Sequence, residues 1–201
     1  MLKNIIYAVL LGVSMAACLS QQDKEPATSS APAEETSLDT PAAPAAPATF
    51  VIARGHVGSV RLGTPVEQLR EHPAAGLTLT DTTLMQEGMQ STAYVLRPEG
   101  EPKGLLVEQR CDTACHVWRI RVLGSDFKTA KGIGVGSKFS ELQQAYNIRS
   151  VTFEEGNLVA LAPETGMSFV LDKSQLPSGK LPDFTAATLP ANTVVKEILV
   201  Y

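Results

Sequence analysis

Polar and apolar residues alternate along much of the chain after residue 50, and this period of two predicts β-strands. We expect eight strands, near residues 77–80, 92–96, 105–109, 117–123, 150–153, 158–161, 168–171 and 194–201. In the stretch HVWRIRVL, the alternation predicts that Val117, Arg119 and Arg121 face one side of a sheet. The opposite side then receives the residues between and after them: Trp118, Ile120 and Val122.

Two similar stretches, VRLGTPVEQLREH and IGVGSKFSELQQAY, each predict a short strand followed by a short helix. Each strand is expected to end at a glycine, Gly63 or Gly136. The next residue, Thr64 or Ser137, is a good helix N-cap because its hydroxyl can accept a hydrogen bond from an unpaired backbone amide. In the first copy, Glu67 completes a capping box. Apolar residues three apart then form one buried face on each helix.

These two stretches and the strands that follow them predict a duplicated domain. Each half reads β-α-β-β-β-β, over residues of about 57–124 and 130–201. We therefore expect an α+β fold with two antiparallel sheets, each packed against one short helix. The segment 50–201 has a normal size for one domain with a hydrophobic core.

The chain begins with an apolar run, residues 5–17, which follows Lys3 and ends in small residues. This run is shorter than the roughly 20 apolar residues of a membrane-spanning helix, and it has the length of a signal-peptide core. The sequence MAAC, which ends at Cys18, resembles the lipobox of bacterial lipoproteins, with methionine where that family usually has leucine. The resemblance implies a signal peptide over residues 1–17 and acyl chains, such as palmitate, on Cys18.

An ordinary secretory signal is the alternative, and it would leave Cys18 as an unpaired thiol. We favour lipidation, because a secreted chain rarely keeps an unpaired cysteine. Two or three acyl chains would anchor the protein firmly to a membrane. In the lipoprotein family, aspartate after the cysteine favours retention at the inner membrane. This chain has Leu19 there, which implies an outer-membrane lipoprotein whose domain faces the periplasm.

Residues 18–49 are predicted to be a disordered tether. They contain repeated Pro-Ala, many Ser and Thr, and few large apolar residues, so they cannot bury enough surface to offset their ordering entropy. The whole chain has a net charge of −4, and the acidic residues of the tether account for most of it. The domain is therefore close to neutral and lacks the basic surface that binding to nucleic acid requires.

The stretch CDTACH is the sharpest candidate for chemistry. Residues on both sides of it predict strands, and a three-residue hairpin loop would place Cys111 opposite Cys115 at bridging distance. The bacterial envelope is oxidising, so we expect a disulfide that stiffens the tip of a hairpin. An exposed, redox-active disulfide is a variant of the same prediction.

Two alternatives use the same cysteines together with His116. Covalent haem attachment has the motif C-x-x-C-H, whereas this chain has one more residue between the cysteines. A copper site would use two thiolates and the imidazole, and the spacing resembles that of copper chaperones of the thioredoxin type. Both alternatives need structural contexts that the predicted hairpin does not provide, so no cofactor and no metal are expected.

Other residues that could take part in binding or catalysis do not form a complete motif. The stretch GIGVGSK departs from a phosphate-binding loop because Ser137 separates the last glycine from the lysine. His56, His72 and His116 are scattered, and no carboxylate lies at a metal-ligand spacing from them. Arg119 and Arg121 are expected to form either a small anion-contact patch or, preferably, a solvated face paired with acids.

The fold has resemblances that rest on Gly63 to Leu69 and on the matching residues Gly136 to Leu142. The duplicated pattern resembles the tandem-repeat fold of beta-lactamase inhibitory protein. It also resembles the small lipoproteins of the outer-membrane assembly machinery, whose helix follows a Gly-Met-Thr stretch. Residues 128–145, with the stretch EEGNLVALAPETGMSFVLD, resemble a family of uncharacterised bacterial envelope lipoproteins. These resemblances imply a fold and a location, without an activity.

The sequence predicts a general class of function but neither a specific partner nor a reaction. We expect a membrane-anchored envelope lipoprotein that acts as a protein-binding, inhibitor or assembly module, with another envelope protein as its partner. The alternatives are a metal or redox protein that uses Cys111, Cys115 and His116, and an enzyme whose site is assembled from scattered residues. Catalysis is left open, and the absence of a catalytic motif favours the binding module over an enzyme.

Overall fold

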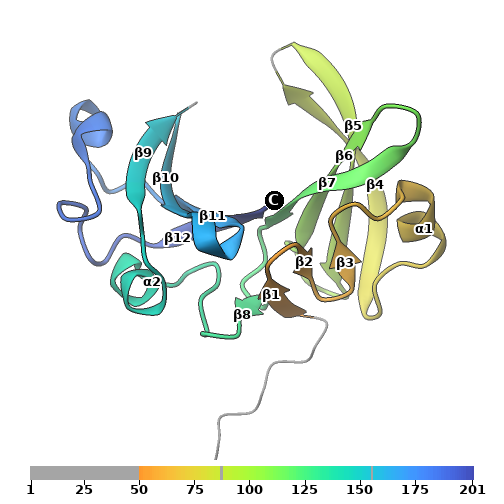
Figure 1. Ribbon diagram of the computed structural model, residues 1–201, viewed down its shortest axis with the longest axis horizontal. Helices are drawn as coiled ribbons and strands as arrows, with labels where there is room; N and C mark the ends of the chain where they lie inside the picture. Colours follow the sequence, from red (N-terminus) through yellow and green to blue (C-terminus); the bar gives the residue numbers. More distant parts are fainter. Residues whose placement is uncertain (1–49, 87, 155) are drawn as a thin grey trace, which may run out of the picture. The chain divides into compact units, whose positions relative to one another are not determined.

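The alternating residues form an antiparallel sheet of eight strands in the order β4-β5-β6-β7-β12-β11-β10-β9 (Figure 1). This arrangement is seen in a computed structural model that describes residues 50–201, except 87 and 155. The strands span Leu77–Gln86 (β4), Met89–Pro98 (β5), Leu105–Cys111 (β6), Cys115–Val122 (β7), Ser150–Glu154 (β9), Asn157–Ala162 (β10), Met167–Leu171 (β11) and Val195–Val200 (β12). All eight strands expected from the alternation are therefore confirmed, most of them longer than expected.

The two predicted sheets are joined into one. Strand β7, the last of the first half, pairs with β12, the last strand of the second half. The paired residues are Ile120 with Val200, Arg121 with Leu199, and Val122 with Ile198. The prediction of one separate sheet in each half is therefore wrong, because the halves share a sheet through their final strands.

A second, small sheet contains strands of two or three residues. Its order is β3-β2-β1-β8, and its members are Val60–Arg61 (β3), His56–Val57 (β2), Val51–Ala53 (β1) and Lys128–Thr129 (β8). Strand β8 pairs with β1 in parallel, so this sheet joins the start of the domain to the segment between the two halves. In the second half, the strand expected before Gly136 is replaced by a turn and an isolated bridge at Gly134.

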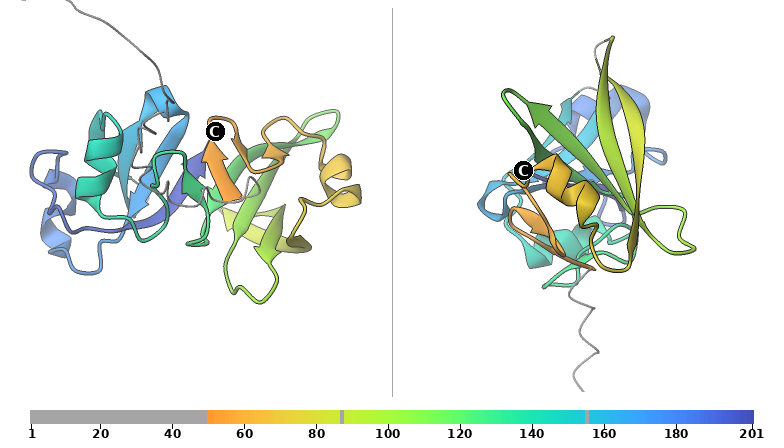
Figure 2. Two further views of the ribbon diagram at one scale, coloured as in Figure 1. Left: turned by 90° about the horizontal axis from the view of Figure 1, so that it is seen from below. Right: turned by 90° about the vertical axis from the view of Figure 1, so that its right-hand side faces the viewer.

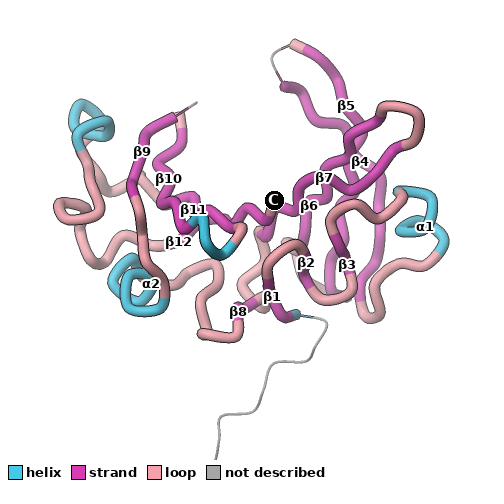
Figure 3. Tube along the Cα trace, in the orientation of Figure 1, coloured by secondary structure: helices cyan, strands magenta, loops and turns pink. Residues whose placement is uncertain are grey.

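Two short α-helices pack against the large sheet, as the sequence predicts. Helix α1 covers Val66–Glu71 and helix α2 covers Phe139–Ala145. The apolar pairs Val66 with Leu69 and Phe139 with Leu142 are buried, which confirms the expected buried faces. Two short 3-10 helices are also present, η2 at Pro163–Thr165 and η3 at Ser178–Asp183. The protein is mostly β, with two sheets and few helices (Figure 3).

The helix N-termini differ from the predicted caps at Thr64 and Ser137. Helix α1 begins after Pro65, whose extended backbone (ψ 134°) separates Thr64 from the first turn, and no side chain caps it. The Ser137 hydroxyl accepts from the backbone amide of Gly134 at 3.1 Å, inside the preceding turn. At helix α2, the Glu141 carboxylate instead accepts from the Lys138 backbone amide at 2.8 Å, which is one half of a capping box.

The hydrophobic core lies on one face of the large sheet. It joins inward residues of the strands to both helices and to the small sheet, as in Ile120, Ile198, Leu69, Phe139 and Ile52. Figures 1 and 2 show no described helix or strand over the opposite face. We call this opposite face the open face. It carries the alternate residues of the same strands, and Leu106 and Val170 on it are buried yet lie outside the core cluster.

The predicted signal peptide (1–17), the lipidated Cys18 and the tether (18–49) lie outside the described residues. The described residues fall within one structural unit, which spans Ala43–Tyr201. Within residues 50–201, leaving aside 87 and 155, no helix is long and apolar enough to cross a membrane.

We predict that the change Ile198→Ala lowers the free energy of unfolding by about 3 kcal/mol, the usual cost of removing a large buried aliphatic side chain. Ile198 is fully buried where the two halves of the sheet meet. The exposed Lys196 of the same strand supplies the control, and Lys196→Ala should change stability by less than about 0.5 kcal/mol. Denaturant unfolding measures both, and equal effects would contradict this placement of the core.

Candidate functional site

Four charged side chains meet at the middle of the open face. Glu108 comes from β6, Arg119 and Arg121 from β7, and Glu197 from β12. Arg119 donates to both carboxylate oxygens of Glu108, at 3.1 Å from Nε and 2.6 Å from Nη2. Arg121 donates in the same way to Glu197, at 2.5 and 3.0 Å, and its Nη1 lies 3.8 Å from Glu108. We call these four residues the charge lattice.

A β-bulge at Trp118 separates Val117 from the face that carries both arginines. The β6–β7 register runs from Glu108 opposite Arg119 to Gln109 opposite Val117, so Trp118 is an extra residue in β7. Val117 is buried in the core together with Ile120, and the arginines point away from it. The predicted grouping of Val117 with Arg119 and Arg121 is therefore wrong, because the alternation of β7 is interrupted at Trp118.

Trp118 is held by two arginines. The guanidinium carbon of Arg110 lies 3.9 Å from the centre of the indole ring, and that of Arg119 lies 5.1 Å from it. Both distances allow a cation–π attraction. The extra residue of the bulge therefore packs against the charge lattice as well as extending β7.

Burial makes the charge lattice different from a surface salt bridge. The side chains of Glu108 and Glu197 are only 5% and 8% exposed, whereas those of Arg119 and Arg121 are 26% and 30% exposed. Hydrogen bonding to Glu197 raises the pKa of Arg121, so this guanidinium stays charged. Two bidentate pairs fix the planes of both arginines. The lattice is electrically neutral as a set and presents guanidinium groups to solvent.

Apolar side chains continue the open face beside the charge lattice. A hollow of about 310 Å³ lies between the arginines and strands β9 to β12. Its apolar lining consists of Val159, Leu161, Val170 and Leu199. The open face thus combines fixed charges with apolar surface, the mixture that is typical of protein–protein contact regions.

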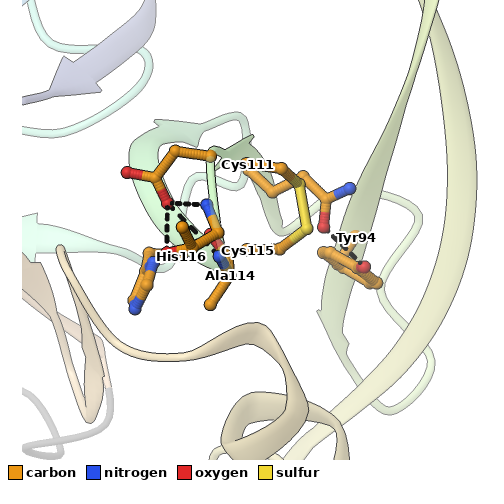
Figure 4. The surroundings of a disulfide bond; sticks show 8 residues. Tyr94, Cys111, Ala114, Cys115 and His116 are labelled. Carbon is orange, nitrogen blue, oxygen red and sulfur yellow. Dashed lines mark hydrogen bonds between the residues drawn. A yellow bond between two sulfur atoms is a disulfide. The ribbon is translucent and has the colours of Figure 1, made fainter.

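The predicted disulfide between Cys111 and Cys115 is confirmed (Figure 4). The two cysteines are opposite each other at the end of the β6–β7 hairpin. Within the three-residue loop, the Asp112 carboxylate accepts from the backbone amides of Thr113 and Ala114, at 2.5 and 3.3 Å. These two bonds lower the pKa of Asp112. The tip is therefore fixed by one covalent bond and a local turn.

The structure brings His116 next to the disulfide without forming a metal-ligand set. Its Nδ1 lies 3.2 Å from the carbonyl oxygen of Ala114 in the hairpin loop. Both cysteine sulfurs are in the disulfide, so a copper or haem site here would first require reduction. Across residues 50–201 as described, no group of three or more His, Cys, Asp or Glu side chains is placed to hold a metal ion.

The remaining candidates from the sequence are His56, His72 and the glycine-rich stretch. His56 Nδ1 lies 3.2 Å from the carbonyl oxygen of Arg54, and His72 follows the last residue of helix α1. The glycine-rich stretch forms the turn before helix α2, where Gly136 has a φ of +88° that favours glycine. The structure therefore explains this glycine by backbone conformation.

Glu108 and Glu197 were not singled out from the sequence. The expectation that Arg119 and Arg121 are paired with acids is confirmed, but the partners belong to other strands, and Glu197 lies 76 residues from Arg121. The available signal is a single glutamate inside each of two apolar strands, LLVEQR and VVKEILV. Buried charges of this kind are rare unless they are paired.

The structural comparisons support the fold alone. The uncharacterized protein YfeY from Escherichia coli has a similar structure, with a TM-score of 0.56 over 75% of this chain and 98% of that chain, at 20% sequence identity. No protein-family model and no curated protein sequence matches the chain.

We predict that Glu197→Ala lowers the free energy of unfolding by about 2 kcal/mol, because it leaves the partly buried Arg121 without its bidentate partner. The double change Glu197→Ala with Arg121→Met should recover at least half of this loss. Thermal or denaturant unfolding of the single and double variants measures the coupling. Additive losses would show that the pair does not act as a unit.

We also predict that the hairpin loop reports the titration of Asp112. Because its folded-state pKa is lowered, the Asp112 bonds stabilise the loop above the unfolded-state pKa and are lost as the pH falls through the folded-state pKa. The amide NMR shifts of Thr113 and Ala114 should therefore change together, with a midpoint below 3.8, the usual pKa of an aspartate. A midpoint at or above that value would contradict the two hydrogen bonds.

Proposed function

We propose that this protein is a lipid-anchored envelope module that binds another protein through the open face. The observation that carries the proposal is the charge lattice, which lies on a sheet face that no described helix or strand covers. Fixed arginines in a contact surface give specificity and lose little conformational entropy on binding. The apolar residues beside them supply area that becomes buried in a complex.

The anchor belongs to the same proposal. Cys18, lipidated after removal of residues 1–17, holds the chain at the outer membrane, and residues 18–49 tether the domain in the periplasm. A chain of this composition extends by up to about 3.1 Å per residue where it is polyproline II. The tether therefore lets the open face reach a partner at a distance from the anchor.

We further propose that the domain arose by tandem duplication. A helix followed by four strands occurs twice in the chain order, as α1 with β4 to β7 and as α2 with β9 to β12. The strand orders β4-β5-β6-β7 and β12-β11-β10-β9 place both final strands at the centre of the sheet. Two copies that meet at their final strands produce one wide sheet, and thus an open face larger than either half offers.

A crosslinking pull-down tests the proposed function. The full-length protein is tagged after Tyr201, crosslinked in intact envelopes and captured, and the captured proteins are identified by mass spectrometry. The variant Leu161→Glu places a charge in the apolar part of the open face, and we expect it to reduce the dominant captured protein at least tenfold. The control Gln144→Glu adds the same charge at an exposed position of helix α2, which packs on the core side of the sheet through Phe139 and Leu142.

The variant Cys18→Ser removes the acylation site and serves as the anchor control. Capture of the same protein by wild type and Gln144→Glu, with loss in Leu161→Glu, supports binding through the open face. Equal capture by wild type, Gln144→Glu and Leu161→Glu, or capture of no protein above the Cys18→Ser background, would contradict the proposal.

A further inference from the structure

The β4–β5 and β6–β7 hairpins separate beyond the middle of the sheet. Strand β5 pairs with β6 only from Ala93 to Leu96, opposite Glu108 to Leu105. The β4–β5 pairing continues beyond this point to Met89, and the β6–β7 pairing continues to the disulfide. The right-hand view of Figure 2 shows the two hairpins diverging toward their tips. The tip-side ends of β5 and β6 therefore do not pair with each other.

A cleft of about 590 Å³ lies between the two hairpins and helix α1. Thr92 and Tyr94 line it on the β5 side, and Gln109 and Cys115 line it on the other side. The Tyr94 hydroxyl donates to Gln109 Oε1 at 2.9 Å, which joins the hairpins where they begin to separate (Figure 4). The volume is within the range of known binding pockets.

Thr92 of β5 and Gln109 of β6, which line the cleft, belong to strand segments that are not paired with each other. Residues 89–92 of β5 and 109–111 of β6 have no strand pairing across the cleft among the residues that the structure describes. Alternate backbone N–H and C=O groups of such an edge are available to an added strand. Polypeptide segments bind to sheet edges in this way, with backbone bonds for affinity and side-chain contacts for specificity.

The charge of the cleft favours a basic segment. Arg70 is paired with Asp81, whose carboxylate lies 3.1 Å away, so these two lining residues neutralise each other. Glu67, on helix α1, also lines the cleft and forms no ion pair with any described residue. A lysine or arginine of a bound segment can supply the missing positive charge.

The hairpin tips are suited to hold such a segment. The disulfide and the Asp112 turn fix the β6–β7 tip, so this wall loses little entropy on binding. At the β4–β5 tip, Met85 and Met89 are 63% and 70% exposed, and they are two of the three exposed large hydrophobic residues among those described. Exposed methionines adapt to different apolar partners.

We propose that this cleft binds an extended segment of the partner protein as an added β-strand, with a basic side chain of the segment placed at Glu67. The inference rests on the proposed function, because it adds a second contact with the same partner, at which the partner binds as an extended segment. The open face and the cleft are lined by different residues, so each can be tested without the other.

A defined peptide tests the cleft directly. The probe is the fluorescently labelled peptide TVTVKVTVT, titrated into the full-length protein in detergent and followed by anisotropy. A second peptide has proline in place of the valine on each side of the lysine, which removes two backbone donors. A third has glutamate in place of the lysine. We expect the first peptide to bind at least tenfold more tightly than either of the others.

Two variants locate the binding. Glu67→Gln should reduce the preference for lysine over glutamate to less than threefold, because it removes the charge of the cleft. The open-face variant Leu161→Glu should leave peptide binding unchanged, so failure of the cleft is distinguishable from failure of the proposed function. Equal binding of the proline peptide, a lysine preference unchanged by Glu67→Gln, or no binding of the first peptide would each overturn the proposal.

Discussion

The pairing of β7 with β12 is the contact on which the rest of the structure depends. It joins strands from opposite halves of the chain, and it places Val122 against Ile198 and Ile120 against Val200 on the core side. On the other side, the same two strands bring Arg121 to Glu197. One backbone register thus completes the hydrophobic core, unites the sheet and assembles half of the charge lattice. A shift by one residue would exchange the two faces and bury charges in the core.

The side chains on the two faces of the large sheet are accommodated differently. On the core face, both helices and the small sheet bury the large side chains. The open face retains its charges because each buried carboxylate has a bidentate arginine. Such pairs contribute little net stability compared with apolar residues of the same shape, so stability alone does not explain their presence. The binding function that we propose accounts for it, since orientation and charge decide specificity at a recognition surface.

Local features of this fold could be predicted from the sequence, whereas its long-range contacts could not. The eight strands and both helix faces follow from hydrophobic periods, and the disulfide follows from the hairpin around CDTACH. The joining of the sheets depends on register between distant segments, which no local pattern specifies. The bulge at Trp118 changes which residues share a face, and it requires the opposing strand to be known. Strands of two residues, as in the small sheet, are too short to have a period.

The central claim is that the open face is covered by a protein in the envelope. Hydroxyl-radical footprinting of the full-length protein, in intact envelopes and after purification in detergent, tests this claim most directly. The account predicts that Leu161 and Leu199 are oxidised at least fivefold more slowly in envelopes than in the purified protein, while the exposed His72 and side chains on helix α2 serve as internal references. Equal oxidation of Leu161 and Leu199 in both preparations would contradict the account.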